Sequence, residues 1–134
     1  MTKKECMVFG SNEAGIHGAG AAFYAHKNHG AKWGVGIGLA GNSYAIPTKD
    51  KNIRTLPLEQ VKLYVADFLL FVDQNPDMTF MVTKIGCGLA GFEEREIAPL
   101  FRSCLEKDNV KLPKDFLDIL CPNGYSKDKI SFMW

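Results

Sequence analysis

The sequence lacks several of the features that indicate a function directly. Its formal net charge is only +1 over 134 residues, so a bound anion must be held by local groups rather than by a field over the whole molecule. No apolar run approaches the roughly 20 residues that a membrane-spanning helix needs. We therefore expect neither nucleic acid nor a membrane as a partner, and the sequence leaves the oligomeric state open.

The sequence also lacks closely spaced cysteines, and this excludes some sites. The four cysteines lie far apart, with no Cys-x-x-Cys pair and no Cys/His ligand spacing: Cys6, Cys87, Cys104 and Cys121. This argues against a structural zinc site, and we expect neither a metal nor a cofactor. The first apolar stretch is too short for a secretory signal. A cytoplasmic protein with free thiols is expected.

Glycine, in contrast, is abundant. The 13 glycines make up about a tenth of the chain, against about 7% in an average protein. They are dense in two windows, 10–20 and 86–91, and in the segment 30–41. Glycine is favoured where the backbone bends sharply or approaches a ligand closely, so these windows are the first candidates for a site.

The remaining pattern predicts strands alternating with helices in one domain, residues 1–134. We expect strands at 6–9 and 79–83, extended segments at 35–39 and 43–47, and a short strand at 110–112. Helices are expected from 17–20 to about 28, from Pro57 to about 74, and over 93–107, with a short segment at 115–120. One apolar face is expected on the second helix, formed by Leu58, Val61, Leu63, Val65, Phe68, Leu69 and Val72. Residues 48–55 suggest a polar surface loop, the core covers about 5–120, and 121–134 stay unassigned.

This alternation implies an α/β fold with a mainly parallel sheet covered by helices. In such sheets, ligands bind beyond the carboxyl ends of the strands. Both glycine windows follow a strand and precede a helix, so we expect them to converge at that edge although about 70 residues separate them.

Each window has the properties of a phosphate cradle: free backbone amides, no Cβ atoms in the way, and a helix N-terminus pointing at the anion. For either window alone, a tight turn without a ligand is an equal alternative. Ser11 and Asn12 could add side-chain hydrogen bonds to a base or ribose. The candidate binding residues are Gly10, Ser11, Asn12, His17, Gly18, Ala19, Gly20, Gly86, Cys87, Gly88, Leu89, Ala90, Gly91 and Phe92.

Three segments together resemble a compact macro domain: Gly-Ala-Gly-Ala-Ala at 18–22, Tyr-Ala-Ile-Pro-Thr-Lys at 44–49 and Ile-Gly-Cys-Gly-Leu at 85–89. The resemblance is strongest to the ADP-ribosyl-glutamate hydrolase branch, and it extends to short macro-like proteins of bacteriophages. It covers about residues 5–120. The resemblance implies a three-layer α/β/α fold with a mixed sheet that binds ADP-ribose, its diphosphate between the two loops and Phe92 near the distal ribose.

Only one of the two catalytic residues of that branch has a counterpart in this sequence. The resemblance offers Lys49 for the working lysine, displaced by one residue, but Ala90 occupies the position of the working aspartate. A methyl group cannot act as an acid or base. Asp50 or His17 could act with Lys49 instead. The alternative for Asp50 is a solvent-exposed pair with Lys49, and the alternative for His17 is a hydrogen bond to the backbone of its own loop. Cys87 has no identifiable base, and Glu93 and Glu94 suit the first turn of a helix.

The sequence thus supports three hypotheses. The first is a domain that binds ADP-ribose or a related phosphate-bearing nucleotide. The second is a hydrolase of ADP-ribosyl esters or ribose phosphates that uses Lys49 with Asp50 or His17. The third is a phage-derived protein that sequesters a nucleotide signal of host defence without changing it.

Overall fold

The strand β1 (Lys4–Asn12) lies at the centre of the sheet, and its segment Cys6–Phe9 is buried on both faces. Such strands show continuous apolar runs rather than alternation, as Cys-Met-Val-Phe does here. In the computed structural model, which describes residues 4–132, β1 pairs in parallel with β3 (Ser43–Lys49) and with β4 (Met78–Val82). The predicted parallel arrangement around this strand is confirmed.

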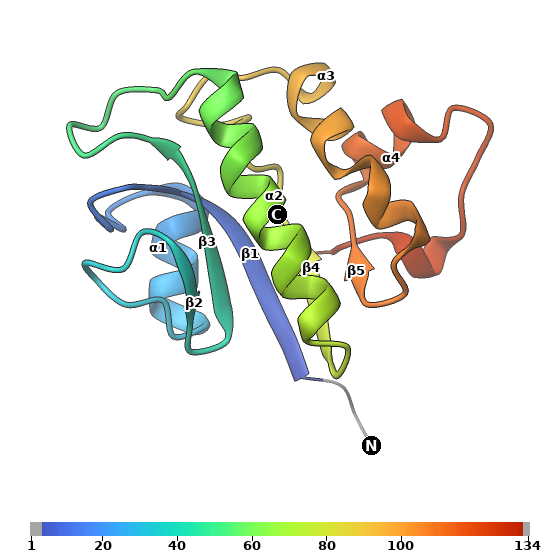
Figure 1. The fold of residues 1–134 in the computed structure, drawn as a ribbon, viewed down its shortest axis with the longest axis horizontal. Coiled ribbons are helices and arrows are strands. Elements are labelled where there is room, and N and C mark those ends of the chain that lie inside the picture. The colour runs from blue at the N-terminus through green and yellow to red at the C-terminus, as the bar shows by residue number, and fades with distance from the viewer. Residues whose placement is uncertain (1–3, 133–134) are drawn as a thin grey trace.

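The complete sheet has five strands in the order β2-β3-β1-β4-β5 (Figure 1). β5 (Val110–Lys111) continues the parallel arrangement beside β4, whereas β2 (Gly38–Ala40) is an antiparallel edge strand on β3. The sheet is therefore mixed and mainly parallel, as the sequence predicts. Of the expected segment 35–39, only its last two residues lie in β2.

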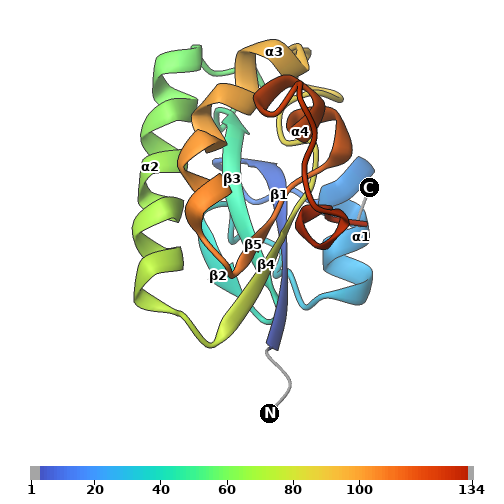
Figure 2. The same ribbon diagram turned by 90° about the vertical axis from the view of Figure 1, so that its right-hand side faces the viewer.

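Helices cover both faces of this sheet (Figure 2). α1 (Gly20–Asn28) packs on one face against a small cluster that includes Met7, Phe9 and Ala45. The other face carries the larger core around Phe68 and Phe101, which come from α2 (Leu58–Gln74) and the 3-10 helix η1 (Ala98–Glu106). α3 (Glu94–Ile97) and α4 (Lys114–Leu120) pack beside η1. Within residues 4–132, no helix is long and apolar enough to cross a membrane.

Two strands extend further than the sequence predicts. β1 includes Gly10, Ser11 and Asn12, which we expected in the glycine loop, and β3 includes Thr48 and Lys49, which we expected in a surface loop. The reason is mutual pairing, because the ends of β1 and β3 run side by side and shift register between Ser11 and Asn12. Thr48 is accordingly buried, and the loop after β1 begins at Glu13.

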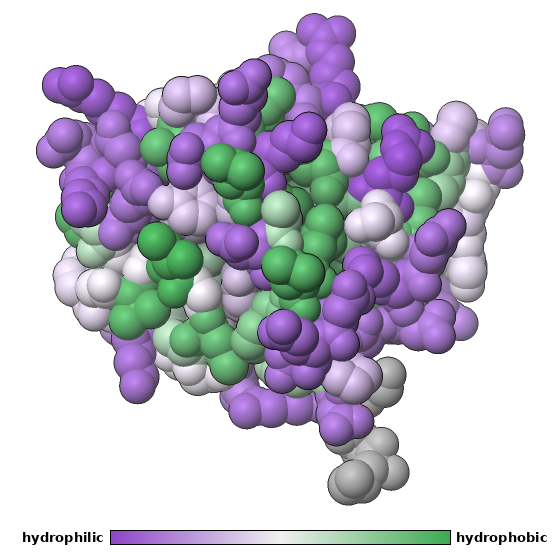
Figure 3. All heavy atoms as spheres, viewed as in Figure 1, coloured by the Kyte–Doolittle hydropathy of each residue, from purple (hydrophilic) through white to green (hydrophobic). Residues whose placement is uncertain are grey.

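α2 begins after Pro57 and ends at Gln74, in agreement with the prediction. Its buried residues are Val61, Val65, Phe68 and Val72. Leu63 was wrongly placed on the buried face: its side chain is 60% exposed, because it follows Val61 by two residues, about 200° around the helix. Apolar atoms therefore remain visible on the face of the molecule that α2 covers (Figure 3).

The single helix predicted over 93–107 is also incorrect. Only Glu94–Ile97 is α-helical, and the chain then tightens into η1. Pro99 lies in the first turn of η1 and has no N–H to donate to a carbonyl one turn earlier. A tighter 3-10 winding satisfies the neighbouring groups instead.

The C-terminal segment covers the β5 side of the sheet. After η2 (Lys127–Lys129), Ile130 forms a parallel bridge with Leu112, and the backbone N–H of Ser131 donates to the carbonyl of Leu112 at 2.7 Å. The residues that the sequence left unassigned thus protect an edge strand, up to residue 132, and positions 133–134 lie outside the described residues.

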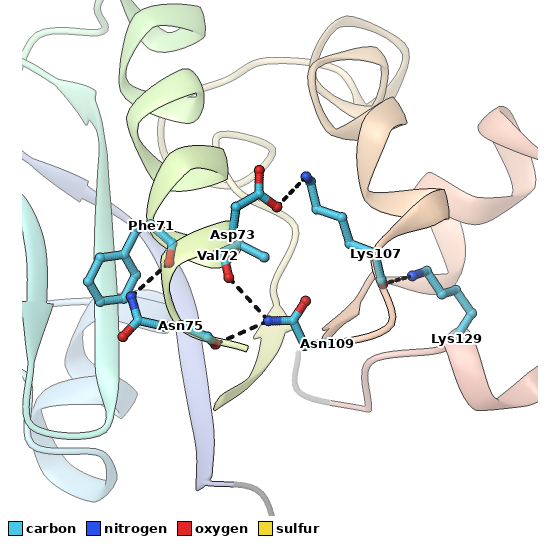
Figure 4. A network of polar contacts seen from close by, with 7 residues as sticks. All are labelled: Phe71, Val72, Asp73, Asn75, Lys107, Asn109 and Lys129. Carbon is cyan, nitrogen blue, oxygen red and sulfur yellow. Dashed lines mark hydrogen bonds and ion pairs between the residues drawn. The ribbon is translucent and has the colours of Figure 1, made fainter. Parts of the chain in front are cut away.

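A polar network closes the end of α2 (Figure 4). The Asn109 side-chain amide donates to the carbonyls of Val72 at 3.3 Å and Asn75 at 3.2 Å. The Lys107 ammonium pairs with Asp73 at 2.7 Å. Each of these carbonyls also accepts a backbone N–H, from Asn75 and Met78 respectively, both at 3.1 Å. Asn109 therefore adds a second donor at the C-terminal end of α2, where carbonyls have lone pairs to spare.

We expect Asn109→Ala to lower the free energy of unfolding by about 0.5 to 1.5 kcal/mol, because the two carbonyls lose their second donor and keep only the backbone N–H. Urea unfolding measures the change. Asn123→Ala is the control, since the exposed Asn123 side chain makes no hydrogen bond within the described residues. Equal stability of both variants would contradict this role of Asn109.

Candidate functional site

A cavity of about 640 Å³ opens at the carboxyl ends of β1, β3 and β4. Its walls come from the end of β1, the loop before α1, the end of β3 and the loop after β4. The chain leaves β1 toward α1 on one face and leaves β4 toward α3 on the other. The cavity therefore lies at the switch point of the sheet, the usual ligand position in open α/β folds. The two glycine windows converge as the sequence predicts.

Ser11 and Asn12 line this cavity, but their polar atoms bind the protein. The Ser11 hydroxyl donates to the carbonyl of Gly36 at 2.5 Å. The Asn12 amide makes two bonds to Ile16, accepting from its N–H at 2.9 Å and donating to its carbonyl at 2.8 Å. Both side chains shape the first loop, a role different from the ligand contacts that we expected of them.

His17 is fully buried and is not among the residues that line the cavity. Its Nε2 lies 2.8 Å from the carbonyl oxygen of Lys32, to which it donates, because a carbonyl can only accept. The imidazole meets the rings of Phe9 and Trp33 edge to face. This placement matches the structural alternative, in which the buried His17 ring holds the first loop through its hydrogen bond to the backbone.

In the second glycine loop, which follows β4, Phe92 packs against Gly86. The Phe92 N–H donates to the Gly86 carbonyl at 2.8 Å, and a Cβ at Gly86 would lie 3.1 Å from the Phe92 ring. Gly86 also has a φ of 78°, which favours glycine. Gly91 and Phe92 do not line the cavity, and Phe92 packs against the core instead of facing a ligand.

Gly18 and Gly88 are different, because neither conformation nor packing requires glycine there. Both have ordinary φ values, and a Cβ at either position would meet no atom within 4 Å. The amides of Ala19 and Leu89 beside them have no hydrogen-bond acceptor within residues 4–132. Ala19 and Leu89 both line the cavity, so the two loops bring amides without an acceptor to it, an arrangement that suits an anion.

The charged groups at the cavity are both cationic. Lys49 and Lys84 line it, and no carboxylate does so within the part of the chain that the structure describes. Lys84 pairs with Asp115 at 3.2 Å, whereas Lys49 has no ion-pair partner among the described residues. Asp50 does not line the cavity, and its Oδ1 accepts from the N–H groups of Asn52 at 2.8 Å and Arg54 at 3.0 Å.

Cys87 lines the cavity with a thiol that stays protonated. Burial raises the pKa of the Cys87 thiol from 9.0 to about 12, and the nearby Glu94 adds to the increase. Glu93 and Glu96 form a reciprocal capping box at the start of α3, the structural role expected of acids in a first turn. A thiolate nucleophile at position 87 is therefore disfavoured. Within residues 4–132, no cluster of His, Cys, Asp and Glu could hold a metal ion.

The structure adds cavity residues that sequence reasoning missed. Ile16, Ile53 and Lys84 line the cavity, as do the buried residues Thr48 and Thr83. Ile16 lies inside the first glycine window and Lys84 two residues before the second, so their position could have been noticed. Ile53 could not, because only the extension of β3 carries its loop to the cavity.

Comparisons of this chain with protein-family models, curated proteins and solved structures find no match. The proposals below therefore depend on the geometry of the cavity and on the motif resemblance.

We expect native Cys87 to react with iodoacetamide at pH 8 at least roughly tenfold more slowly than Cys87 in the urea-unfolded chain. Raising the pKa from 9.0 to about 12 makes the thiolate fraction roughly a thousandfold smaller, and greater nucleophilicity offsets only part of this loss. Mass spectrometry of the Cys87 peptide gives both rates. Equal rates in the two states would restore Cys87 as a candidate nucleophile.

Proposed function

We propose that this protein binds ADP-ribose or a related phosphate-bearing nucleotide in the cavity between its two glycine-rich loops. One observation carries the proposal: Gly18 and Gly88 face each side of the cavity with open space where a Cβ would lie. Since the protein itself does not require glycine there, close approach by a ligand is the remaining reason for it. A three-layer macro-domain-like fold is part of the same proposal and rests on the motif resemblance.

The charge and size of the cavity support this class of ligand. Two lysines without a carboxylate favour an anion, and free amide N–H groups can donate to the oxygens of a diphosphate. The volume of about 640 Å³ lies within the range of about 300–1,000 Å³ typical of small-molecule sites. The nucleotide would thus be held by backbone donors, with Lys49 and Lys84 adding charge.

Binding is better supported than hydrolysis. Ala90 lines the cavity where the resemblance calls for an aspartate, while Asp50 and His17 do not line it. Of the three residues proposed for catalysis, only Lys49 lines the cavity. The hydrolase remains the alternative, and a sequestering protein would show the same binding with an unchanged ligand.

We expect calorimetric titration to detect ADP-ribose binding by the wild-type chain and to lose it in Gly18→Leu and Gly88→Leu. A leucine at either position would fill the space that the ligand needs, and both variants should fold because no protein atom lies within 4 Å of the added Cβ.

Ala66→Leu is the matched control, because it adds the same side chain at an exposed position on α2. Thermal unfolding verifies that all variants are folded. No binding of ADP-ribose, NAD or cyclic ADP-ribose by the wild type at millimolar concentration would overturn the proposed function.

Lys49→Gln should weaken ADP-ribose binding about tenfold at low salt and reduce the dependence of affinity on salt, because it removes an unpaired cation at the cavity. Lys62→Gln, on the exposed side of α2, is the control. Mass spectrometry of ADP-ribosylated peptides after incubation tests hydrolysis: an intact modification supports binding alone, whereas release that requires Lys49 would establish the hydrolase.

A further inference from the structure

The loop between β3 and α2 contains an unusual backbone conformation. Ile53 has a φ of 63°, and within residues 4–132 it is the one non-glycine residue with a positive φ. A β-branched side chain is strongly disfavoured in this left-handed region, where glycine, asparagine or aspartate is usual. Strain of this kind persists where the surrounding structure enforces it, and it is concentrated at functional sites.

The surroundings of Ile53 do enforce it. The Ile53 N–H donates to the Asp50 carbonyl at 3.1 Å, and the Asp50 N–H donates to the Arg54 carbonyl at 2.8 Å. The Asp50 carboxylate accepts from the N–H groups on both sides of Ile53, those of Asn52 and Arg54. Asp50 thus holds a tight turn with Ile53 near its end.

The same loop is tied to the second glycine loop. The Thr55 hydroxyl donates to the carbonyl of Ala90 at 2.9 Å, and Thr55 forms a bridge with Lys49 at the end of β3. The turn is therefore fixed relative to the wall of the cavity that carries Gly88 and Leu89. Ile53 is held at the rim in a defined position.

Ile53 has no packing role in the core that would offset the cost of its backbone conformation. Its side chain is 41% exposed, lines the cavity and does not belong to either buried cluster. Ile16, 44% exposed, and Leu89, 73% exposed, line the cavity from the two glycine loops. Three exposed aliphatic side chains from three loops thus line the same cavity as the free amides, and their apolar surface would leave water if a ligand covered it.

From this arrangement we infer that Ile53 is a specificity-determining residue that contacts the organic part of the bound nucleotide, its base or ribose, together with Ile16 and Leu89. The inference rests on the proposed function, because the amides of the glycine loops must hold the phosphates. It adds a selection rule: the site prefers a nucleotide over inorganic pyrophosphate, since pyrophosphate has no apolar surface to cover the three side chains.

The test compares Ile53→Asn with Ile53→Val by calorimetry, using ADP-ribose and inorganic pyrophosphate, and by thermal unfolding without ligand. Asparagine tolerates the left-handed conformation but removes the apolar contact, so the unfolding midpoint should rise by about 2 to 5 °C. The affinity for ADP-ribose should fall about tenfold, while that for pyrophosphate stays within about twofold of wild type. Valine keeps the β-branched, apolar character and should behave like wild type.

Each other outcome overturns the inference in a recognisable way. If Ile53→Asn binds ADP-ribose as wild type does, Ile53 does not select the ligand, although the proposed function stands. A lowered unfolding midpoint would show that Ile53 has a purely structural role, and equal losses for both ligands would show damage to the anion site. If the wild type binds neither ligand, the proposed function fails and the inference with it.

Discussion

The parallel pairing of β1 with both β3 and β4 is the constraint on which the rest of the structure depends. It places the carboxyl ends of three strands at one edge, so that segments distant in sequence meet around one cavity. Parallel neighbours also need crossover connections, and here α1 crosses on one face and α2 on the other. The cavity opens where these connections diverge. Its position follows from chain topology, whereas the residues around it determine which ligand it can take.

Glycine serves separate purposes around this cavity, and distinguishing them identifies where a ligand could approach. A Cβ at Gly36 would lie 2.0 Å from the carbonyl oxygen of Asn12, so glycine there permits close packing of the chain behind the first loop. At Gly86 the reason is a positive φ together with the nearby Phe92 ring. Gly18 and Gly88 have neither reason. An abundance of glycine therefore does not by itself indicate a phosphate site, and the argument for a ligand depends on the two positions whose Cβ would enter open space.

The sequence predicted the features that depend on local signals: the long helix after Pro57, the buried run at 6–9 and the convergence of two strand–loop–helix units. It failed where a distant partner decides. The polar atoms of Ser11 bind Gly36, 25 residues away, and the His17 ring binds the backbone of Lys32. Neither partner has a recognisable motif, so the sequence offered Ser11 as a ligand contact and left His17 open between a ligand role and bracing of the loop. Ile53 was missed for a related reason, because its backbone conformation arises from a turn closed by Asp50 and tied to Ala90 through Thr55.

The balance between binding and catalysis rests on the charges at the cavity. In the proposed complex, free amides and Lys49 would stabilise a phosphate in a bound ligand and in a transition state alike, and uniform stabilisation of this kind does not accelerate a reaction. Acceleration would need a group that acts only as the bond breaks, such as an acid or base within reach of the leaving oxygen. Asp50 is engaged by backbone amides, His17 lies behind the loop, and Cys87 keeps its proton. Aliphatic side chains and two lysines around one cavity suit the proposed retention of a nucleotide, and this chemistry favours the proposed binding protein over the hydrolase.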